Sequence, residues 1–160
     1  MVNLHVIAIG KIKEKFMRDA MEEYVKRLSP FCRISVLELA ESKVSSDPSP
    51  AEISAAIAGE GKRIISKIPS GSYVFSMCIE GEQLSSEQLA GHIAHVTLEG
   101  KSSLCFIIGG SFGLSDDVKK ASDFRLSMSR MTFPHQLARV LLVEQLYRAF
   151  SINNNGKYHK

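Results

Sequence analysis

Residues 103–113 read SLCFIIGGSFG and form the clearest junction between a strand and a loop in this chain. The first six residues are almost all apolar, which is typical of a strand buried on both faces of a sheet. Three glycines follow at positions 109, 110 and 113. Glycine tolerates left-handed backbone angles and lets the backbone approach a neighbour closely. The stretch therefore predicts a buried parallel strand that ends in a tight turn.

Apolar segments of the same kind recur on both sides of this stretch and alternate with helical patterns. Strands are predicted at residues 2–9, 33–39, 73–79 and 124–127, and helices at residues 16–28, from 50, from 85 or 86, at 115–121 and from 134. Alternation of this kind predicts an α/β fold with a mainly parallel sheet and helices on both faces. We expect residues 1–160 to form one domain.

Local signals refine this outline. Ser49, Pro50 and Glu52 have the spacing of a capping box with proline at the first helical position. Glu80 and Gly81 predict a turn after the strand at 73–79. Residues 41–50 (ESKVSSDPSP) are the most loop-like in the chain, and we expect them to form a mobile insertion.

The composition excludes several classes of protein. Apolar residues make up 44% and charged residues 23% of the 160, so general disorder is excluded. The three cysteines have neither zinc-ligand spacing nor an even count, which favours reduced thiols in a cytoplasmic protein and predicts no metal site. No apolar run approaches membrane length, and the first residues lack the order of a secretory signal.

The charge is uneven along the chain, although the net charge is only +3. From residue 131 onward the only acid is Glu144, against Arg139, Arg148, two lysines and two histidines. Such a basic terminal third suits a phosphate-rich partner. On charge alone a solvated basic face explains it equally well.

Ligands of open α/β sheets bind at the carboxyl ends of the strands, beside a topological switch point. Segments 77–81, 109–113 and 126–133 leave such ends. The glycines of the second segment also suit a plain turn, and they lack the order of a dinucleotide site or a phosphate loop. In the third segment two methionines and a phenylalanine alternate with small hydroxyls, which predicts either apolar walls for a flat ring or an ordinary edge strand.

The last predicted helix and the tail carry the remaining signals. Apolar residues cover more of this helix than one sheet face buries, so it is either enclosed or pairs with a second chain, and we favour a dimer. His135 at its start suits a structural role. Tyr158 and His159 follow a flexible polar run, where disorder is the usual outcome, yet they offer stacking and proton transfer.

At this point five motifs, spread over essentially the whole chain, show a family resemblance. They read HVIAIGKIKEKF (5–16), SYVFSMCIEGEQLSSEQLA (72–90), IIGGSFGLSDDV (107–118), LSMSRMTFPHQLARVLLVEQLYRAFSI (126–152) and YHK (158–160). The chain resembles the RlmH family, bacterial methyltransferases of the SPOUT (trefoil-knot) class that methylate N3 of a pseudouridine in helix 69 of 23S rRNA on the assembled ribosome.

The resemblance implies a C-terminal trefoil knot, S-adenosylmethionine as cofactor, and a homodimer in which the partner's tail completes the active site. Cofactor contacts are implied at Met77, Gly109, Met128, Ser129, Arg130, Met131, Thr132 and Phe133. Arg148, Tyr158 and His159 are implied in substrate handling or methyl transfer. His159 is then the candidate general base, Arg148 the group that stabilises charge or binds phosphate, and Tyr158 the group that contacts the target base.

Two other functions remain as alternatives. A non-enzymatic ribosome-associated binding protein would use the same basic face without a cofactor. A nucleotide-dependent enzyme would use the glycine turn for phosphates, but the missing phosphate-loop lysine argues against it.

Overall fold

The computed structural model describes all 160 residues. The elements are β1 (Val2–Ile9), α1 (Lys15–Leu28), β2 (Cys32–Leu39), α2 (Pro50–Ile65), β3 (Tyr73–Gln83), α3 (Ser86–Leu98), β4 (Ser103–Ile108), α4 (Asp116–Ala121), β5 (Phe124–Ser127) and α5 (His135–Asn153). The five strands form one sheet in the order β2-β1-β4-β3-β5. All four pairings are parallel, so the predicted α/β fold is confirmed.

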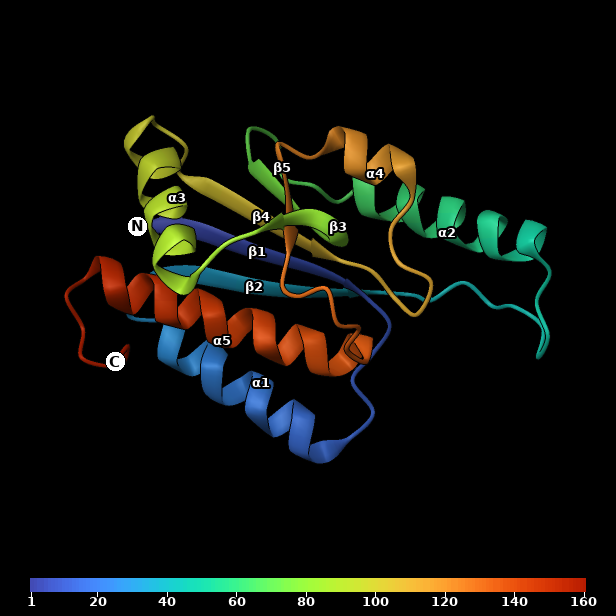
Figure 1. Cartoon of the computed structure of the whole chain (residues 1–160), viewed down its shortest axis with the longest axis horizontal. Helices are drawn as coiled ribbons and strands as arrows, with labels where there is room; N and C mark the ends of the chain where they lie inside the picture. The colour runs from blue at the N-terminus through green and yellow to red at the C-terminus, as the bar shows by residue number, and fades with distance from the viewer.

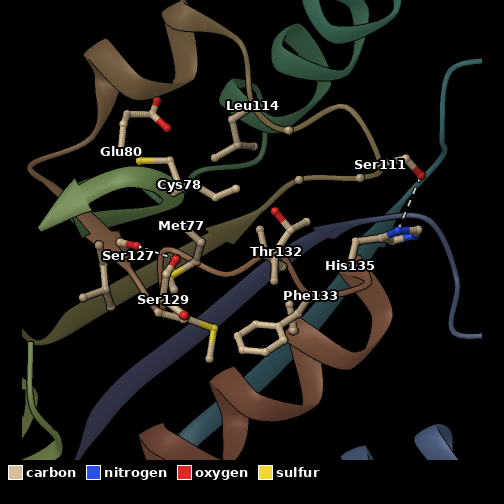
Figure 2. Close-up of a pocket in the computed structure, with 18 of the residues that line it drawn as sticks. Met77, Cys78, Glu80, Ser111, Leu114, Ser127, Ser129, Thr132, Phe133 and His135 are labelled. Carbon is tan, nitrogen blue, oxygen red and sulfur yellow. Dashed lines mark hydrogen bonds between the residues drawn. The ribbon is translucent and has the colours of Figure 1, made fainter. Parts of the chain in front are cut away.

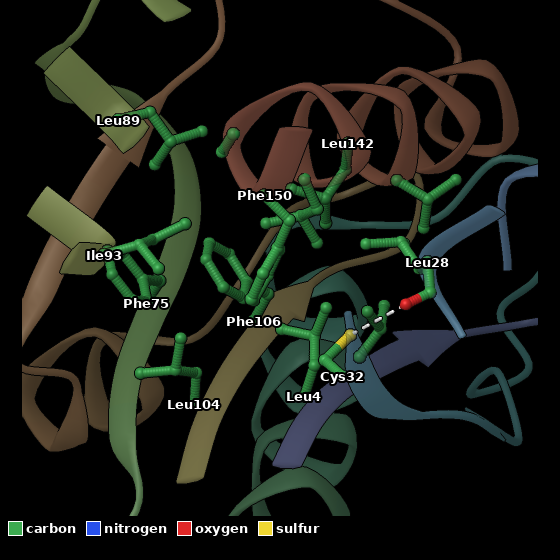
Figure 3. Packing of buried hydrophobic residues seen from close by; sticks show 14 of the residues in the cluster. Leu4, Leu28, Cys32, Phe75, Leu89, Ile93, Leu104, Phe106, Leu142 and Phe150 are labelled. Atoms are coloured by element: carbon green, nitrogen blue, oxygen red, sulfur yellow. Dashed lines mark hydrogen bonds between the residues drawn. The ribbon is translucent and has the colours of Figure 1, made fainter. Parts of the chain in front are cut away.

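Helices cover both faces of this sheet (Figure 1). Helices α1, α3 and α5 pack on one face over the larger hydrophobic cluster, and α2 and α4 pack on the other over the smaller one. In the larger cluster the rings of Phe75 and Phe106, from neighbouring strands, stack with centroids 4.2 Å apart (Figure 3). The buried strands β1 and β4 lie at the centre of the sheet, as their nearly continuous apolar sequences require.

The helix starts follow the predicted capping chemistry only in part. Ser49 caps α2 by accepting from the Glu52 amide, with Pro50 at the first helical position. The carboxylate of Glu52 does not return to Ser49, because it accepts from the amide and hydroxyl of Ser45 at 3.2 and 3.1 Å. The full reciprocal capping box lies on α3 instead, between Ser85 and Gln88.

The predicted turn at Glu80 and Gly81 is wrong. Strand β3 continues to Gln83, and its register against β5 shifts between Met77 and Glu82. A Cβ on Gly81 would lie 2.8 Å from the backbone of β5, so the glycine allows a close approach of two strands where a turn was expected.

Residues 41–50, expected to be a mobile insertion, are tied to α2 by several bonds. The amide of Ser42 donates to Glu60 at 2.9 Å, and Arg63 donates to the hydroxyl of Ser42 at 2.8 Å. Ser45 is held by Glu52 as described above. These bonds hold the first half of the segment against α2.

Helix α5 lies between α1 and α3 on its face of the sheet, and none of residues 135–152 is fully exposed. Arg139, counted above in a basic face, is 1% exposed. Its guanidinium pairs with Glu38 at 2.7 Å and donates to the carbonyls of Ile9 and Gly10. The burial of Arg139 therefore removes it from any basic surface. No helix of the chain is both long enough and apolar enough to cross a membrane.

Candidate functional site

The main cavity lies beside residues 77–80 of β3 and the carboxyl ends of β4 and β5, and it has a volume of about 790 Å³ (Figure 2). Its walls are residues 77–80, 108–114, 126–129 and 131–135, together with Lys119 and Ala138. The three segments expected at strand ends thus meet around one space. Two of them follow the ends of the parallel strands β4 and β5 at the same edge of the sheet, and the third lies within β3 beside them. Half of the 22 lining residues are hydrophobic.

The glycine segment forms a rigid rim on one side of this cavity. The amide of Gly113 donates to the carbonyl of Gly110 at 3.1 Å, which closes a tight turn with Ser111 and Phe112 at its tip. Gly113 has a φ of +82°, in the region that favours glycine. A Cβ on Gly109 would lie 2.8 Å from the backbone of Gly113, so any side chain there would displace the turn.

Opposite this rim, the loop after β5 holds itself in place through serine hydroxyls. Ser127 donates to the carbonyl of Ser129 at 3.1 Å, and the hydroxyl of Ser129 accepts from the amide of Met131 at 2.9 Å. The strand ends at Ser127, so the edge-strand interpretation of the following residues is wrong. In Figure 2 the side chains of Ser129 and Phe133 lie along this wall.

The structure brings together most of the residues expected to contact a cofactor. Met77, Gly109, Met128, Ser129, Met131, Thr132 and Phe133 all line the cavity. Arg130 does not: it is exposed and lines a shallow neighbouring hollow with Gln83 and Leu84. Its guanidinium reaches no partner in this hollow.

Sequence reasoning placed Glu80 and Ser111 in segments at strand ends, but it missed Lys119 as a polar group of the cavity. Lys119 of α4 pairs with Glu80 of β3, and both line the wall near Cys78. Burial raises the pKa of the Cys78 thiol, so this thiol is a poor nucleophile at neutral pH. His135 lies at the start of α5 with Nδ1 3.5 Å from the hydroxyl of Ser111. The only sequence signal for Lys119 was its place in the short helix after the glycine turn.

The tail residues form a second cluster around Glu144, which we call the tail cluster: Glu87, Glu144, Arg148, Tyr158 and His159. Arg148 donates to Glu144 from Nη2 at 2.6 Å and from Nε at 3.2 Å, and the Tyr158 hydroxyl donates to the same oxygen at 3.1 Å. The Arg148 guanidinium also lies over the Tyr158 ring, 4.7 Å from its centroid. One carboxylate therefore orients both side chains.

Both ring nitrogens of His159 are occupied within the tail cluster. Nδ1 lies 3.0 Å from Nη1 of Arg148, which can only donate, so Nδ1 accepts. Nε2 lies 2.6 Å from a carboxylate oxygen of Glu87, to which it donates its proton. Burial, assisted by Tyr24 and Glu144, raises the pKa of Tyr158 to about 12, so its phenol stays protonated. Neither side chain has a free basic atom in this arrangement.

The cavity and the tail cluster lie at opposite ends of α5. Ala138 near the start of the helix lines the cavity, whereas Arg148 lies ten residues further on. A rise of about 1.5 Å per residue separates these positions by roughly 15 Å along the helix axis. None of Arg148, Tyr158 and His159 lines the cavity of its own chain. No group of three His, Cys, Asp or Glu side chains is arranged to hold a metal ion.

Comparison with known proteins agrees with this geometry. A family model described as "Predicted SPOUT methyltransferase" matches residues 2–159. A protein of Clostridioides difficile named "Ribosomal RNA large subunit methyltransferase H" is 48% identical over 99% of this chain and 100% of its own length. The chain belongs to this methyltransferase family. Relatives of the same name from Carboxydothermus hydrogenoformans and Moorella thermoacetica are 45% and 46% identical, again over the full length of each relative.

Solved structures of this methyltransferase fold are similar over most of the chain. A probable methylase family protein from Haemophilus influenzae Rd KW20 superposes with a TM-score of 0.55 at 14% identity, covering 98% of this chain and 70% of the other. A tRNA (m1G37) methyltransferase from Aquifex aeolicus superposes with a TM-score of 0.53 at 16% identity, covering 92% of this chain and 69% of the other. At these identities the likeness establishes the fold alone.

Proposed function

We propose that this protein is an S-adenosylmethionine-dependent methyltransferase that methylates N3 of a pseudouridine in helix 69 of 23S rRNA, acting in the cytoplasm on the assembled ribosome. The observation that carries the proposal is the open, half-apolar cavity at the strand ends, in a chain whose full-length relatives bear the name of a ribosomal RNA large subunit methyltransferase. The trefoil knot of this class is part of the proposal.

The cavity suits such a cofactor. Met77, Leu126 and Phe133 offer apolar surface for a flat adenine ring, and the backbone of residues 109–113 and 127–133 lies beside them with groups able to bind its edge. Its volume of about 790 Å³ is within the range of small-molecule sites. When bound, S-adenosylmethionine supplies a methyl group activated by a sulfonium.

The tail cluster is suited to the nucleic-acid substrate. The Arg148 guanidinium would stabilise negative charge on the oxygens of a uracil-type ring as its N3 proton leaves. The protonated phenol of Tyr158 would donate a hydrogen bond to that ring or stack on it. For His159 to accept the N3 proton, Nδ1 must first release Arg148, so substrate binding has to rearrange the cluster.

A symmetric homodimer would join the two halves, with the tail of one chain at the cavity of the other. The distance along α5 supports this, because one chain keeps its tail cluster away from its own cavity. Leu137 and Leu141 support it further: they are partly exposed on α5 and do not pack against the core cluster. An apolar pair on the outward face of a helix suits an isologous contact.

Mixed dimers test this arrangement. Arg148→Ala chains keep their cavity, and Gly109→Ala chains, whose turn is displaced, keep their tail. The assay uses a cofactor concentration too low for the Gly109→Ala cavity. If the tail acts on the partner, an equal mixture of the two impaired proteins then regains about one quarter of wild-type activity, since half the dimers hold one intact hybrid site. Continued inactivity of mixtures that contain heterodimers would show that each tail serves its own chain.

The substrate is tested by mass spectrometry of helix 69 from cells that lack the gene. We expect one methyl group to be missing from a pseudouridine and to return with the wild-type gene but not with Arg148→Ala. Unchanged methylation would disprove the proposed activity. If calorimetry also detected no binding of S-adenosylmethionine, the non-enzymatic binding protein would be the better interpretation.

Recognition of the ribosome is tested with two substrates. A chain of 160 residues has limited surface for reading RNA sequence, so its specificity is expected to depend on the assembled ribosomal surface. Purified enzyme should methylate whole ribosomes far faster than free 23S rRNA. Equal rates on the two would contradict this part of the proposal.

A further inference from the structure

The cavity contains one ion pair, between Lys119 of α4 and Glu80 of β3. The Lys119 side chain is 18% exposed and that of Glu80 is 54% exposed. Both line the cavity on the side of Cys78 and Leu114, and Figure 2 shows Glu80 on the α4 side, away from the loop that holds Ser129 and Phe133. The cavity therefore has an apolar end and a charged end.

The charged end is separate from the residues that sequence similarity assigned to the cofactor. Those residues are Met77, Gly109 and the loop after β5. None of those that line the cavity carries a charge, because the one charged member, Arg130, lies outside it. Besides Glu80 and Lys119, the only other titratable side chains of the cavity are Cys78 and His135. The pair is thus the only place on the wall that offers a fixed positive and a fixed negative charge together.

The Glu80 carboxylate of this pair is ionised at neutral pH. The bond from Lys119 is the main cause that lowers the pKa of Glu80 below its ordinary value. The neighbouring thiol adds no charge, since burial, assisted by Glu80, raises its pKa. An ion pair this exposed contributes little to the stability of the fold, so its place in the cavity wall calls for another explanation.

We propose that Lys119 and Glu80 form the subsite for the amino-acid portion of the cofactor, with Lys119 binding the α-carboxylate and Glu80 the α-ammonium. The inference rests on the proposed function, because it assumes an adenosyl cofactor. A zwitterion placed against an ion pair gives each charge an opposite partner and leaves the net charge of the cavity unchanged. Charge-assisted hydrogen bonds of this kind are about twice as strong as neutral ones.

The subsite predicts how the protein discriminates among adenosyl ligands. S-adenosylhomocysteine carries the amino-acid group, whereas methylthioadenosine has the same adenosine and sulfur without it. Lys119 and Glu80 would contact only the first ligand, and the apolar end with Phe133 would contact both. Substitution of the pair should therefore weaken binding of one ligand selectively.

Isothermal titration of the full-length protein with these two ligands tests the inference. Lys119→Met keeps most of the length of the side chain and removes its charge. We expect it to weaken binding of S-adenosylhomocysteine about tenfold or more, while binding of methylthioadenosine stays within about twofold. Lys120→Met is the matched control, because Lys120 is the next residue of α4, is exposed and does not line the cavity. It should bind both ligands as the wild type does.

Glu80→Gln provides a second variant in case Lys119→Met does not fold, since its amide oxygen can still accept from Lys119. We expect the same selective loss, about severalfold. Equal weakening of the two ligands would show that the pair only shapes the wall, and unchanged binding would show that it does not touch the ligand; either result overturns the inference. Failure of the wild-type protein to bind either ligand would instead overturn the proposed cofactor.

Discussion

The two ends of α5 differ in how far their functional groups are already bonded within the chain. At its start the cavity is open, with apolar walls, a glycine turn and Met131 74% exposed at its edge. At its end the polar groups of Arg148, Tyr158 and His159 are engaged with Glu144 and Glu87. The cavity is therefore open to a ligand from outside the chain, whereas the polar groups of the tail cluster already bond to one another.

Arg148→Ala should have the largest effect, because it should impair methylation without changing cofactor binding. Loss of the guanidinium removes the group expected to stabilise charge on the target ring, so kcat/KM for ribosome methylation should fall roughly 100- to 1,000-fold. Affinity for S-adenosylmethionine should stay unchanged, because Arg148 lies outside the cavity. Arg33→Ala, an exposed arginine of β2, is the control. A parallel loss of cofactor affinity would show that the two ends are coupled within one chain.

Gly109→Ala should have the reverse effect. The added Cβ meets the Gly113 backbone at 2.8 Å and must displace the turn, so cofactor affinity should drop roughly 10- to 100-fold with little change in the tail cluster. The matched control is Gly91→Ala in α3, where a Cβ has no neighbour within 4 Å. That change should stabilise the fold by about 0.5–1 kcal/mol. Calorimetry measures the affinity, and thermal unfolding the stability.

Glu144→Gln should weaken the bonds from Arg148 and Tyr158 to residue 144 without removing them. The pKa of Tyr158, raised to about 12, should fall towards its ordinary value but remain above it, because burial is the largest cause of the shift. Ultraviolet difference titration, with Tyr158→Phe for assignment, measures this change. Methylation should fall about tenfold as Arg148 loses its anchor. An unaltered tyrosine titration would show that Glu144 does not organise the cluster.

The smallest effect is expected at Glu60, outside both ends of α5. Burial raises the pKa of this carboxyl, which is 5% exposed. As the pH rises above the ordinary carboxyl value of 4.5, the unfolded chain loses this proton before the folded one does, so the contribution of Glu60 to stability falls with pH. The stability of Glu60→Gln relative to wild type should therefore be about 1 kcal/mol higher at pH 7 than at pH 4.

Glu52 is the control, because its contribution to stability changes with pH in the opposite direction. Hydrogen bonds from Ser45 lower the pKa of Glu52, so its contribution to stability is present above the ordinary carboxyl pKa and is lost as the pH falls through the lowered one. Glu52→Gln should lose stability at neutral pH relative to acid. Denaturant unfolding at pH 4 and pH 7 measures the free energy of unfolding of both variants. If the two substitutions changed stability in the same direction between these pH values, the opposite pKa shifts of Glu52 and Glu60 would be contradicted.

The sequence predicted the strands, and through them the place of the cavity, because each strand is marked by its own local pattern. The apolar runs at 73–79 and 103–108 and the glycines after them needed no distant partner to be recognised. The sequence placed Glu80 in a segment beside the cavity but predicted a turn there, where β3 in fact continues. Lys119 was missed, because its partner Glu80 lies on a different element and only the tertiary structure brings α4 to it.

What the sequence determined by itself is the alternation of strands and helices, the glycine turn and the family. Short-range periodicity and backbone freedom encode these features within about a dozen residues. The tertiary structure decided the rest. It buried Arg139 against Glu38, 101 residues away in the chain, and it moved a charge from the expected basic face into the interior. It also set the tail cluster and the cavity at opposite ends of one helix, because partners of buried charges and distances between sites follow from packing across the whole sheet.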